Sequence, residues 1–423
     1  MLLFARASFA NASEWRVRMK KGNIVLVVVF CLLLFGCTIA TFVFPKKEFS
    51  VAENRELQKK PKLTGKKVKK GTYQKQYENY LNDQFFQRDG WVRLAVGMQS
   101  LLGQKDSNGV YLGKDGYLLE KPVKADFDEE QTEDNIGYLS TFLNDTADIY
   151  GKKHVSCMMI PSKAQALTNR LPDFAEVPNQ DKVLDSLRSR LTQPEILLDM
   201  SDELQKHQQE YIYYRTDHHW TTLGACYAYA AWAKMTGQAV PHEPEYYQRE
   251  TAFTDFYGTT YNKVPVNVPA DQVELFHSPG EIGVQVVMDE GEATADSMYF
   301  KKAASEGFNR YNVFFSKNTF QIEVITKART GKSLLLIKDS FANCFVPFLT
   351  EEYDRIIMID YRYGKAPIGR IMSQHKEITD VLVVFNTEKF MQNTKLAKLA
   401  DVQKGRQSSG GTMEEFNPED FLE

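Results

Sequence analysis

The sequence has few cysteines and little net charge, and each of these shortages argues against a class of protein. Only five cysteines occur in 423 residues, and no two of them stand at the spacing of a zinc site. Cys31 and Cys37 lie in an uncharged apolar run, whereas Cys157, Cys226 and Cys344 each lie in a separate apolar stretch. We therefore expect buried core cysteines rather than a disulfide framework. The net charge of -3 gives no reason to expect a nucleic acid partner.

The overall composition is that of an average globular protein, with 43% apolar and 25% charged residues. No internal repeat is visible, and the length allows one large domain or two ordinary ones. Aromatic residues make up 12%, and Tyr and Phe far outnumber Trp. Such a set suits a packed interior and also carbohydrate contact.

One long apolar run, Asn23–Phe44, carries no charge and is about as long as a membrane-spanning helix. Basic residues precede it, so the positive-inside rule predicts a cytoplasmic N-terminus and an extracytoplasmic remainder. A cleaved signal peptide is the alternative, but the run is longer than the h-region of a typical signal peptide and is not followed by a clear small-x-small cleavage site. Phe35-Gly36-Cys37 resembles a lipoprotein processing site, yet the apolar run continues past it. We expect an uncleaved, single-pass anchor in the cell membrane.

The patterns divide the chain into five parts. We expect a short cytoplasmic segment (1–22), the anchor (23–44), a basic linker with a membrane-proximal helical segment (45–105), a large α/β domain (106–394) and a disordered polar tail (395–423). The basic stretch ending in "GKKVKK" is either a solvated linker or a contact for anionic lipid headgroups or an anionic wall polymer. "NGVYLGKDGYLLE" predicts a β-hairpin around Lys114-Asp115-Gly116.

Beyond this hairpin, strands and helices alternate, which predicts a mostly parallel sheet covered on both faces. Short apolar runs predict buried strands at "HVSCMMI", "EILLDM", "SLLLIKDS", "RIIMID" and "DVLVVFN". "TTLGACYAYAAWAKMTG" predicts a helix that ends at Gly237, and the run "FANCFVPFLTEEY" after the "SLLLIKDS" strand predicts another.

Ser340 stands where a predicted strand ends and a helix begins. In open α/β sheets, ligands bind at the carboxyl ends of the strands, so its hydroxyl is well placed for chemistry. Backbone N–H groups at the start of that helix, including that of Phe341, are candidates to hold a developing oxyanion. The alternative is a serine that only caps the helix.

The stretch "RTDHHWTTLGA" supplies the groups that a serine nucleophile needs. A serine hydroxyl needs an adjacent base, and an imidazole oriented by a carboxylate can take its proton. The spacing of Asp217 and His219 lets both side chains point the same way, whereas His218 is expected to point away. We predict an Asp217–His219–Ser340 triad.

A metal site is the competing interpretation of the same stretch. Phosphoesterases named for a DHH motif need additional Asp-rich motifs, and none is found here. His207 lies ten residues before Asp217 on a different predicted element. We expect no bound metal, and nothing in the sequence suggests a cofactor.

Four stretches together resemble the DHHW family of bacterial surface proteins. They are "ENREL" (Glu53–Leu57), "VYLGKDGYLLE", "RTDHHWTTLGA" and "LLLIKDSFANCFVPFLTEEYDRIIMIDYRY". That family is similar to the SGNH-hydrolase-like domains of alginate O-acetyltransferases, which share a D-x-H-W loop before a D-S-F strand end. The resemblance implies a three-layer α/β/α SGNH-hydrolase-like domain with a central, mostly parallel sheet, behind a single N-terminal transmembrane helix.

The resemblance also assigns roles to single residues. Asp217, His219 and Ser340 match the catalytic triad, and Arg362 matches an arginine near the active site that would hold an acidic substrate group or the oxyanion. We further predict an oxyanion N–H at Gly258 and a side-chain donor at Asn386.

One residue departs from the usual SGNH motif G-D-S. Lys338 stands in place of the glycine, as in other DHHW proteins, and its side chain needs space that glycine leaves open.

The resemblance implies an extracytoplasmic O-acyltransferase that transfers an acetyl group, as the relatives do, to a cell-envelope polysaccharide through an acyl-serine. The alginate relatives work beside a membrane-bound O-acyltransferase that exports acetyl groups, so a similar partner is implied here. Two alternatives stay open: a carbohydrate esterase or deacetylase with the same triad, and a non-catalytic glycan-binding surface protein.

Overall fold

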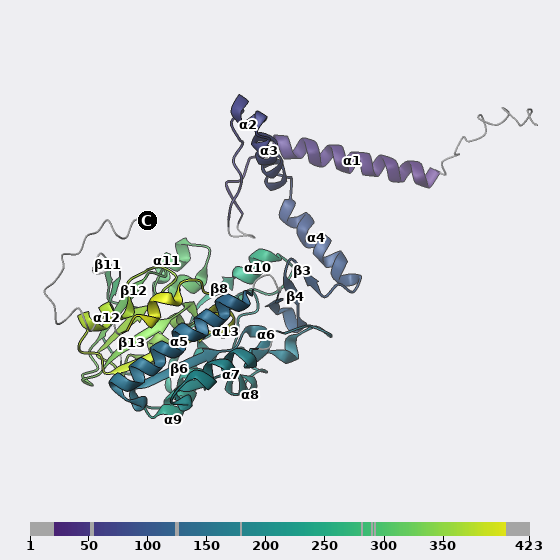
Figure 1. Cartoon of the computed structure of the whole chain (residues 1–423). Helices are drawn as coiled ribbons and strands as arrows, with labels where there is room; N and C mark the ends of the chain where they lie inside the picture. Colours follow the sequence, from purple (N-terminus) through teal and green to yellow (C-terminus); the bar gives the residue numbers. More distant parts are fainter. Residues whose placement is uncertain are drawn as a thin grey trace, which may run out of the picture. The chain divides into compact units, whose positions relative to one another are not determined.

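The structure is a computed structural model that describes residues 21–50, 55–122, 127–177, 180–280, 282–288, 291 and 293–402. The chain divides into two compact units, residues 1–92 and 93–423, which are described separately. Figure 1 labels many of the helices and strands of the two units.

The first unit contains α1 (Lys21–Val43), whose stretch Gly22–Val43 is long and apolar enough to cross a membrane. By length and composition, α1 is a candidate membrane anchor or signal sequence. The predicted helical stretch after the linker forms two helices with a break at residues 84–87. The remaining elements are β1 (Phe49–Ser50), β2 (Arg55–Glu56), α2 (Gly65–Lys69), α3 (Thr72–Asp83) and the start of α4 (Arg88–Leu101). Glu53 and Asn54 of "ENREL" lie outside the described residues.

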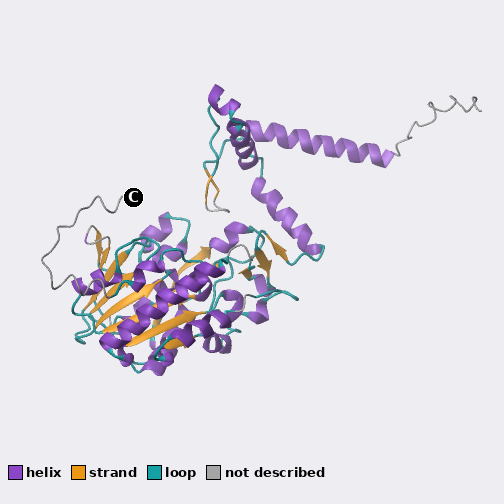
Figure 2. Cartoon of the chain, in the orientation of Figure 1, coloured by secondary structure: helices purple, strands orange, loops and turns teal. Residues whose placement is uncertain are grey.

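The second unit is built on an eight-stranded sheet in the order β11-β10-β12-β14-β13-β15-β6-β7, drawn in orange in Figure 2. The strands from β14 to β7 run parallel, and β12, β10 and β11 add antiparallel neighbours. The five predicted strands are confirmed as β6 (Val155–Ile160), β7 (Leu197–Asp199), β13 (Ser333–Lys338), β14 (Arg355–Ile359) and β15 (Asp380–Asn386). The three antiparallel strands, β10 (Val284–Met288), β11 (Ala293–Ala295) and β12 (Gln321–Thr326), were not predicted.

Both faces of this sheet are buried, because alternate side chains of each central strand enter different cores. In β13, Leu335 and Ile337 join one core, whereas Leu334 and Leu336 join the other. The core that contains Leu335 and Ile337 is covered by four helices: α5 (Glu129–Tyr150), α7 (Asp181–Arg190), α12 (Ile368–Gln374) and α13 (Thr387–Met391). The core that contains Leu334 and Leu336 is covered by α6 (Lys163–Ala166), α8 (Ser201–Lys206), α9 (Thr222–Thr236) and the hairpin of β8 (Gln248–Phe256) and β9 (Asp271–His277). The predicted three-layer α/β/α arrangement is confirmed.

The carboxyl ends of three central strands meet at one edge of the sheet. β15 lies between β13 and β6, with Val384 opposite Lys338 and Asn386 opposite Ile160. The chain leaves β13 toward β14 on one side, and it leaves β6 toward β7 on the other. Such a divergence is where open α/β sheets bind ligands, and Ser340 follows β13 at this edge.

Several local predictions are confirmed. The hairpin forms between β4 (Val110–Leu112) and β5 (Leu118–Glu120), and its turn uses left-handed backbone at Asp115 (φ 54°) and Gly116 (φ 76°). Helix α9 ends at Gly237, also in the left-handed region. The three cysteines of this unit are free and buried.

Two local predictions are wrong. "FANCFVPFLTEEY" forms two short 3₁₀ turns, η9 (Ser340–Cys344) and η10 (Val346–Leu349), instead of one α-helix. Pro347 lacks the backbone N–H that a continuous helix needs. The tail does not become disordered at residue 395, because η11 (Leu396–Ala400) buries Leu396 and Leu399 against α5. Residues 403–423 lie outside the described residues.

Candidate active site

The loop before α9 and the end of β13 bring the three predicted triad residues together. Nδ1 of His219 lies 2.6 Å from Oδ1 of Asp217, and Nε2 of His219 lies 2.8 Å from Oγ of Ser340. Both distances are those of hydrogen bonds in a working nucleophile–base pair. The exposed fractions are 0% for Asp217, 4% for His219 and 7% for Ser340, so the relay is shielded from bulk water.

Asp339, and not Ser340, caps the turn that follows β13. Its carboxylate accepts hydrogen bonds from the backbone N–H groups of Phe341 (2.9 Å) and Asn386 (2.7 Å). Burial raises the pKa of Asp339 above its usual value, although these donors and Arg362 oppose the rise. Because Asp339 takes the capping role, the Ser340 hydroxyl is left for His219. The alternative of a serine that only caps the turn is therefore wrong.

The Asp217 carboxylate is held by four donor groups. Oδ1 accepts from Nδ1 and from the backbone N–H of His219, and Oδ2 accepts from the backbone N–H (2.8 Å) and hydroxyl (2.9 Å) of Thr259. Burial alone would raise the pKa of Asp217, but the neighbouring histidines and these hydrogen bonds outweigh it and hold the pKa well below its usual value. An ionised Asp217 requires a proton on Nδ1 of His219, which leaves Nε2 to accept the serine proton.

Tyr311 fixes the orientation of the imidazole from one face. Its ring stacks on His219 with centroids 3.9 Å apart and planes 9° apart, and its hydroxyl donates to the backbone carbonyl of Ser340 at 2.8 Å. A single buried side chain thus contacts both the base and the nucleophile. Nothing in the local sequence around Tyr311 predicted this contact, because η8 (Arg310–Val313) is far from both motifs in the chain.

The residues after His219 in the motif lock the loop in place. The indole N–H of Trp220 donates to the backbone carbonyl of Phe341 at 2.9 Å, which ties the histidine loop to the serine turn. Thr221 caps α9 by accepting from the N–H of Gly224. A side chain at Gly224 would place its Cβ 2.3 Å from the carbonyl oxygen of Ile212, so this position needs glycine.

The expectation that His218 points away from the site is wrong. Its ring lies 3.8 Å from that of His219, and its Nδ1 is 2.7 Å from the hydroxyl of Thr259. Burial lowers the pKa of His218 to about 3, with the charge of His219 adding to the effect, so the ring is neutral near pH 7. A chain of hydrogen bonds then runs from His218 through Thr259 to Asp217. His218 also lines a small pocket together with Lys163, Phe341 and Lys389.

Two further buried charges hold the loop that carries the motif. The ammonium of Lys163 donates to the carbonyls of Tyr214 (3.0 Å) and Asp217 (2.6 Å), and burial lowers its pKa to about 8. The carboxylate of Asp271 accepts from the backbone N–H groups of Arg215 (2.8 Å) and Thr216 (2.7 Å). Sequence reasoning missed both. Lys163 follows the carboxyl end of β6, and the strand-end rule that identified Ser340 points to this position too.

Gly258 is not an available oxyanion donor, which corrects its predicted role. Its N–H donates to the hydroxyl of Thr216 at 3.0 Å. An added Cβ at Gly258 would lie 2.2 Å from Cβ of Asp217. The glycine therefore makes room for the carboxylate of the triad.

The other two predicted oxyanion donors also have acceptors within the protein. The N–H of Phe341 donates to Asp339. The side-chain amide of Asn386 donates to the carbonyls of Ile160 (3.3 Å) and Pro161 (3.1 Å), which joins the ends of β15 and β6. Their predicted role is corrected to a structural one. Among the described residues, no acceptor is assigned to the backbone N–H of Ser340.

Arg362 forms a bidentate ion pair with Asp360, through Nε at 2.9 Å and Nη2 at 2.6 Å. No hydrogen bond or ion pair joins it to the triad among the described residues, so its role toward substrate stays a prediction. Lys338 is buried behind the nucleophile, with its ammonium 2.7 Å from Oδ1 of Asn343 and 3.7 Å from Oδ2 of Asp360. The ammonium group of Lys338, the lysine of the K-D-S motif, therefore has polar partners inside the protein.

Ligand atoms of Asp217, His218 and His219 lie within 4.8 Å of one another, a spacing that would allow a metal ion. Both oxygens of Asp217 already accept hydrogen bonds, and both nitrogens of His219 already have partners. A metal ion on Nδ1 of His219 would have to displace the proton that forms the hydrogen bond to Asp217. The donor set therefore suits a proton relay better than a tetrahedral site.

Comparisons with known proteins agree with this fold. One solved structure, a DHHW family protein from Eubacterium siraeum, is 24% identical, with a TM-score of 0.56 over 70% of this chain and 95% of that one. Bacillus cereus PatB1 is 19% identical, with a TM-score of 0.55 over 68% of this chain and 99% of that one. PatB1 has also been solved with a sulfonyl adduct, at a TM-score of 0.54. No curated protein matches.

These structures share the SGNH-hydrolase-like fold that the sequence predicted. The family model of the DHHW protein matches residues 124–359, which is more than half of the chain and contains the whole triad loop and Ser340. The chain belongs to the DHHW family.

Proposed function

We propose that this protein is an O-acyltransferase that passes an acyl group, acetyl in the first instance, through Ser340 to a hydroxyl of a cell-envelope polysaccharide. The observation that carries the proposal is the continuous hydrogen-bonded relay from Asp217 through His219 to Ser340. In this proposal α1 is an uncleaved anchor, the N-terminus is cytoplasmic and the second unit is extracytoplasmic. A membrane-bound O-acyltransferase is the proposed source of the acetyl group.

The first half of the reaction loads the serine. Nε2 of His219 takes the proton of the Ser340 hydroxyl while Oγ attacks the carbonyl carbon of the acyl donor. Asp217 stabilises the resulting imidazolium, and the backbone N–H of Ser340 is the proposed donor to the oxyanion. The imidazolium then returns the proton to the leaving group, which departs and leaves acyl-Ser340.

The second half reverses these steps with a new nucleophile. A sugar hydroxyl gives its proton to Nε2 of His219 and attacks the acyl carbon, and the collapse of the intermediate restores the Ser340 hydroxyl. Water in place of the sugar would give hydrolysis.

The test is an acyl-enzyme experiment on the full chain in detergent. Incubation with an activated aryl acetate should give one acetyl adduct by intact mass, located on the peptide that contains Ser340. Ser340→Ala should abolish the adduct, and a sulfonyl fluoride should block it in the wild type. Acetyl transfer to added oligosaccharide would then be compared with release of acetate. Folded wild-type protein that forms no adduct and no product would overturn the proposal.

A further inference from the structure

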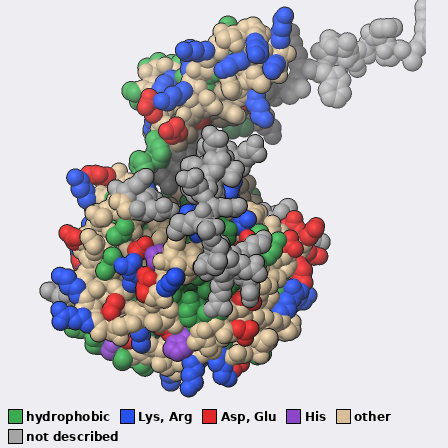
Figure 3. Space-filling view, turned by 60° about the vertical axis from the view of Figure 1, so that its left-hand side comes forward, with side chains coloured by type: hydrophobic (Ala, Val, Ile, Leu, Met, Phe, Trp, Pro, Cys, Tyr) green, Lys and Arg blue, Asp and Glu red, His purple; other side chains and the backbone are tan. Residues whose placement is uncertain are grey.

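The first unit carries a dense set of lysines that the proposed reaction does not use. The segment Lys59–Lys75, called the lysine segment below, contains no aspartate or glutamate. Its exposed lysines are Lys59, Lys60, Lys62, Lys66, Lys69, Lys70 and Lys75, and Lys67 is half-buried. Figure 3 shows Lys and Arg side chains gathered on the face of the smaller unit that it presents.

Contacts inside the first unit fix this segment near the end of α1. The side-chain amide of Gln84 exchanges two hydrogen bonds with the backbone of Lys47 (3.0 and 2.7 Å), and the N–H of Phe86 donates to the hydroxyl of Thr41 at 3.0 Å. The rings of Phe44 and Phe86 lie 4.9 Å apart. The turn that follows α3 is therefore bound to the C-terminal end of α1, where Figure 1 shows α2 and α3.

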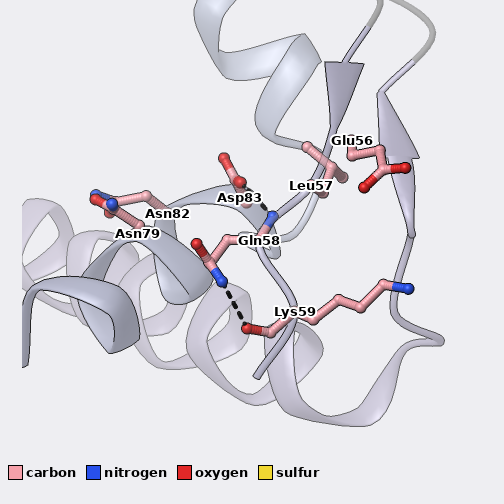
Figure 4. A pocket seen from close by; sticks show the side chains of 7 residues that line it. All are labelled: Glu56, Leu57, Gln58, Lys59, Asn79, Asn82 and Asp83. Carbon is pink, nitrogen blue, oxygen red and sulfur yellow. Dashed lines mark hydrogen bonds between the residues drawn. The ribbon is translucent and has the colours of Figure 1, made fainter. Parts of the chain in front are cut away.

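The lysine segment is in turn attached to α3 at two points. At one end, the N–H of Gln58 donates to Oδ2 of Asp83 at 2.8 Å; Figure 4 shows Gln58 and Lys59 beside this carboxylate, with the Lys59 side chain extending away from it. Farther along, the ammonium of Lys67 donates to Oε1 of Gln76 at 3.2 Å. Because α3 has 12 residues, it is about 18 Å long, and no part of the segment can move far from the end of α1.

Two exposed aliphatic side chains stand among the lysines. Leu63 is 69% exposed and Val68 is 41% exposed. Basic side chains interspersed with exposed apolar ones are typical of a surface that lies on an anionic bilayer, with the lysines at the headgroups and the apolar groups below them. An anionic polysaccharide would attract the lysines but would give Leu63 and Val68 nothing to bury against.

We propose that the lysine segment binds the anionic lipid headgroups of the bilayer that α1 enters. The inference rests on the proposed anchoring by α1, and it adds a second attachment that depends on lipid composition. A carboxylate oxygen of Glu48 lies 3.9 Å from the ammonium of Lys59, and no ion pair joins the other exposed lysines of the segment to any residue that the structure describes. Each lysine at an anionic surface contributes about a fivefold gain in affinity.

The experiment uses the full chain reconstituted in two kinds of vesicle, phosphatidylcholine alone and an equimolar mixture with phosphatidylglycerol. Resistance to carbonate extraction first establishes that α1 is inserted, so a failure of anchoring is distinguished from a failure of the lysine segment to bind lipid. A membrane-impermeant amine reagent then labels the lysines, and mass spectrometry follows each peptide. Lys234, Lys302 and Lys376, exposed in the second unit, are the internal reference.

The expected result is labelling of Lys66, Lys69 and Lys70 that is about fivefold lower in anionic vesicles than in neutral ones, with protection lost at high salt. The reference lysines should react equally in both. Replacement of Leu63 and Val68 by serine should weaken the protection, which distinguishes lipid from polymer. Equal labelling in both vesicles overturns the proposal. Protection by a soluble poly(glycerol phosphate), without any effect of vesicle charge, also overturns it and assigns the segment to a wall polymer.

Discussion

Nε2 of His219 lies 2.8 Å from the hydroxyl oxygen of Ser340, although 121 residues separate the two in the chain. The contact joins the loop before α9 to the end of β13, and it is enforced by groups on both sides. Trp220 bonds the loop to the carbonyl of Phe341, and Tyr311 touches both partners. A hydrogen bond with this much support is a rigid feature of the fold, and rigidity of the base is what general-base catalysis requires.

Replacement of Asp217 by asparagine should keep the fold and remove most of the activity. The amide would donate to Nδ1 of His219 and favour the tautomer with the proton on Nε2, which cannot accept the serine proton. We expect acetyl turnover of an aryl acetate to fall by about 10³- to 10⁴-fold. Thermal unfolding of the variant serves as the control. A variant with the wild-type rate would show that Asp217 does not orient the base.

Two substitutions of Tyr311 separate its two contacts. Tyr311→Phe keeps the ring that stacks on His219 and loses the hydroxyl, which contacts the Ser340 carbonyl and, at 3.4 Å, Sγ of Cys344. Tyr311→Ala loses both. We expect a several-fold decrease in kcat for the first and a decrease of about 100-fold for the second, with a shifted pH profile because the imidazole is less constrained. If the two variants have the same kcat and pH profile, the stacking contact does not position the base.

The chain from His218 through Thr259 to Asp217 can be tested by a double-mutant cycle. His218→Gln and Thr259→Val each break it, so either variant should slow turnover by about tenfold, and the double variant should be hardly slower than Thr259→Val alone. This lack of additivity is the signature of a connected path. Rate losses that simply multiply would show that His218 acts independently of Thr259.

Much of the fold and the three triad residues were predictable because their signals are local. The strands β6, β13, β14 and β15 are short continuous apolar runs, and a parallel sheet buried on both faces needs that pattern. Asp217 and His219 stand two residues apart, and Ser340 follows a strand directly. In each of these cases the informative residues are neighbours in the sequence.

The groups that support the triad gave no such signal. Tyr311, Lys163 and Asp271 come from elements far apart in the chain, and each resembles an ordinary polar or aromatic residue of its segment. The predicted oxyanion donors failed for a related reason. Whether the N–H of Gly258 is free depends on the position of Thr216, which is set by tertiary packing and not by the residues around Gly258.

Gly258→Ala should disturb the site through its volume. The new Cβ would meet Asp217 at 2.2 Å, so the carboxylate or the loop must shift. We expect a loss of about 1–3 kcal/mol in the free energy of unfolding together with a large loss of turnover. Gly280→Ala is the matched control, because an added Cβ there meets nothing within 4 Å. Equal stability of the two variants would refute the steric role.

The buried ammonium of Lys163 should make stability depend on pH in the alkaline range. Its pKa is about 8 in the folded protein and about 10.4 in the unfolded chain, so between these values the unfolded state holds more protons. Stability must then rise with pH through this window, and the penalty for burying the charge is fully present below pH 8. The change is about 3 kcal/mol at most.

Urea unfolding of the wild type and of Lys163→Met, from pH 7 to pH 10, measures this effect. The variant loses the hydrogen bonds to the carbonyls of Tyr214 and Asp217, which gives a pH-independent loss of stability. The difference between the two proteins should therefore grow in favour of the wild type as the pH rises above 8. A difference that stays constant over this range would mean that Lys163 keeps an ordinary pKa and that the loop tolerates its charge without cost.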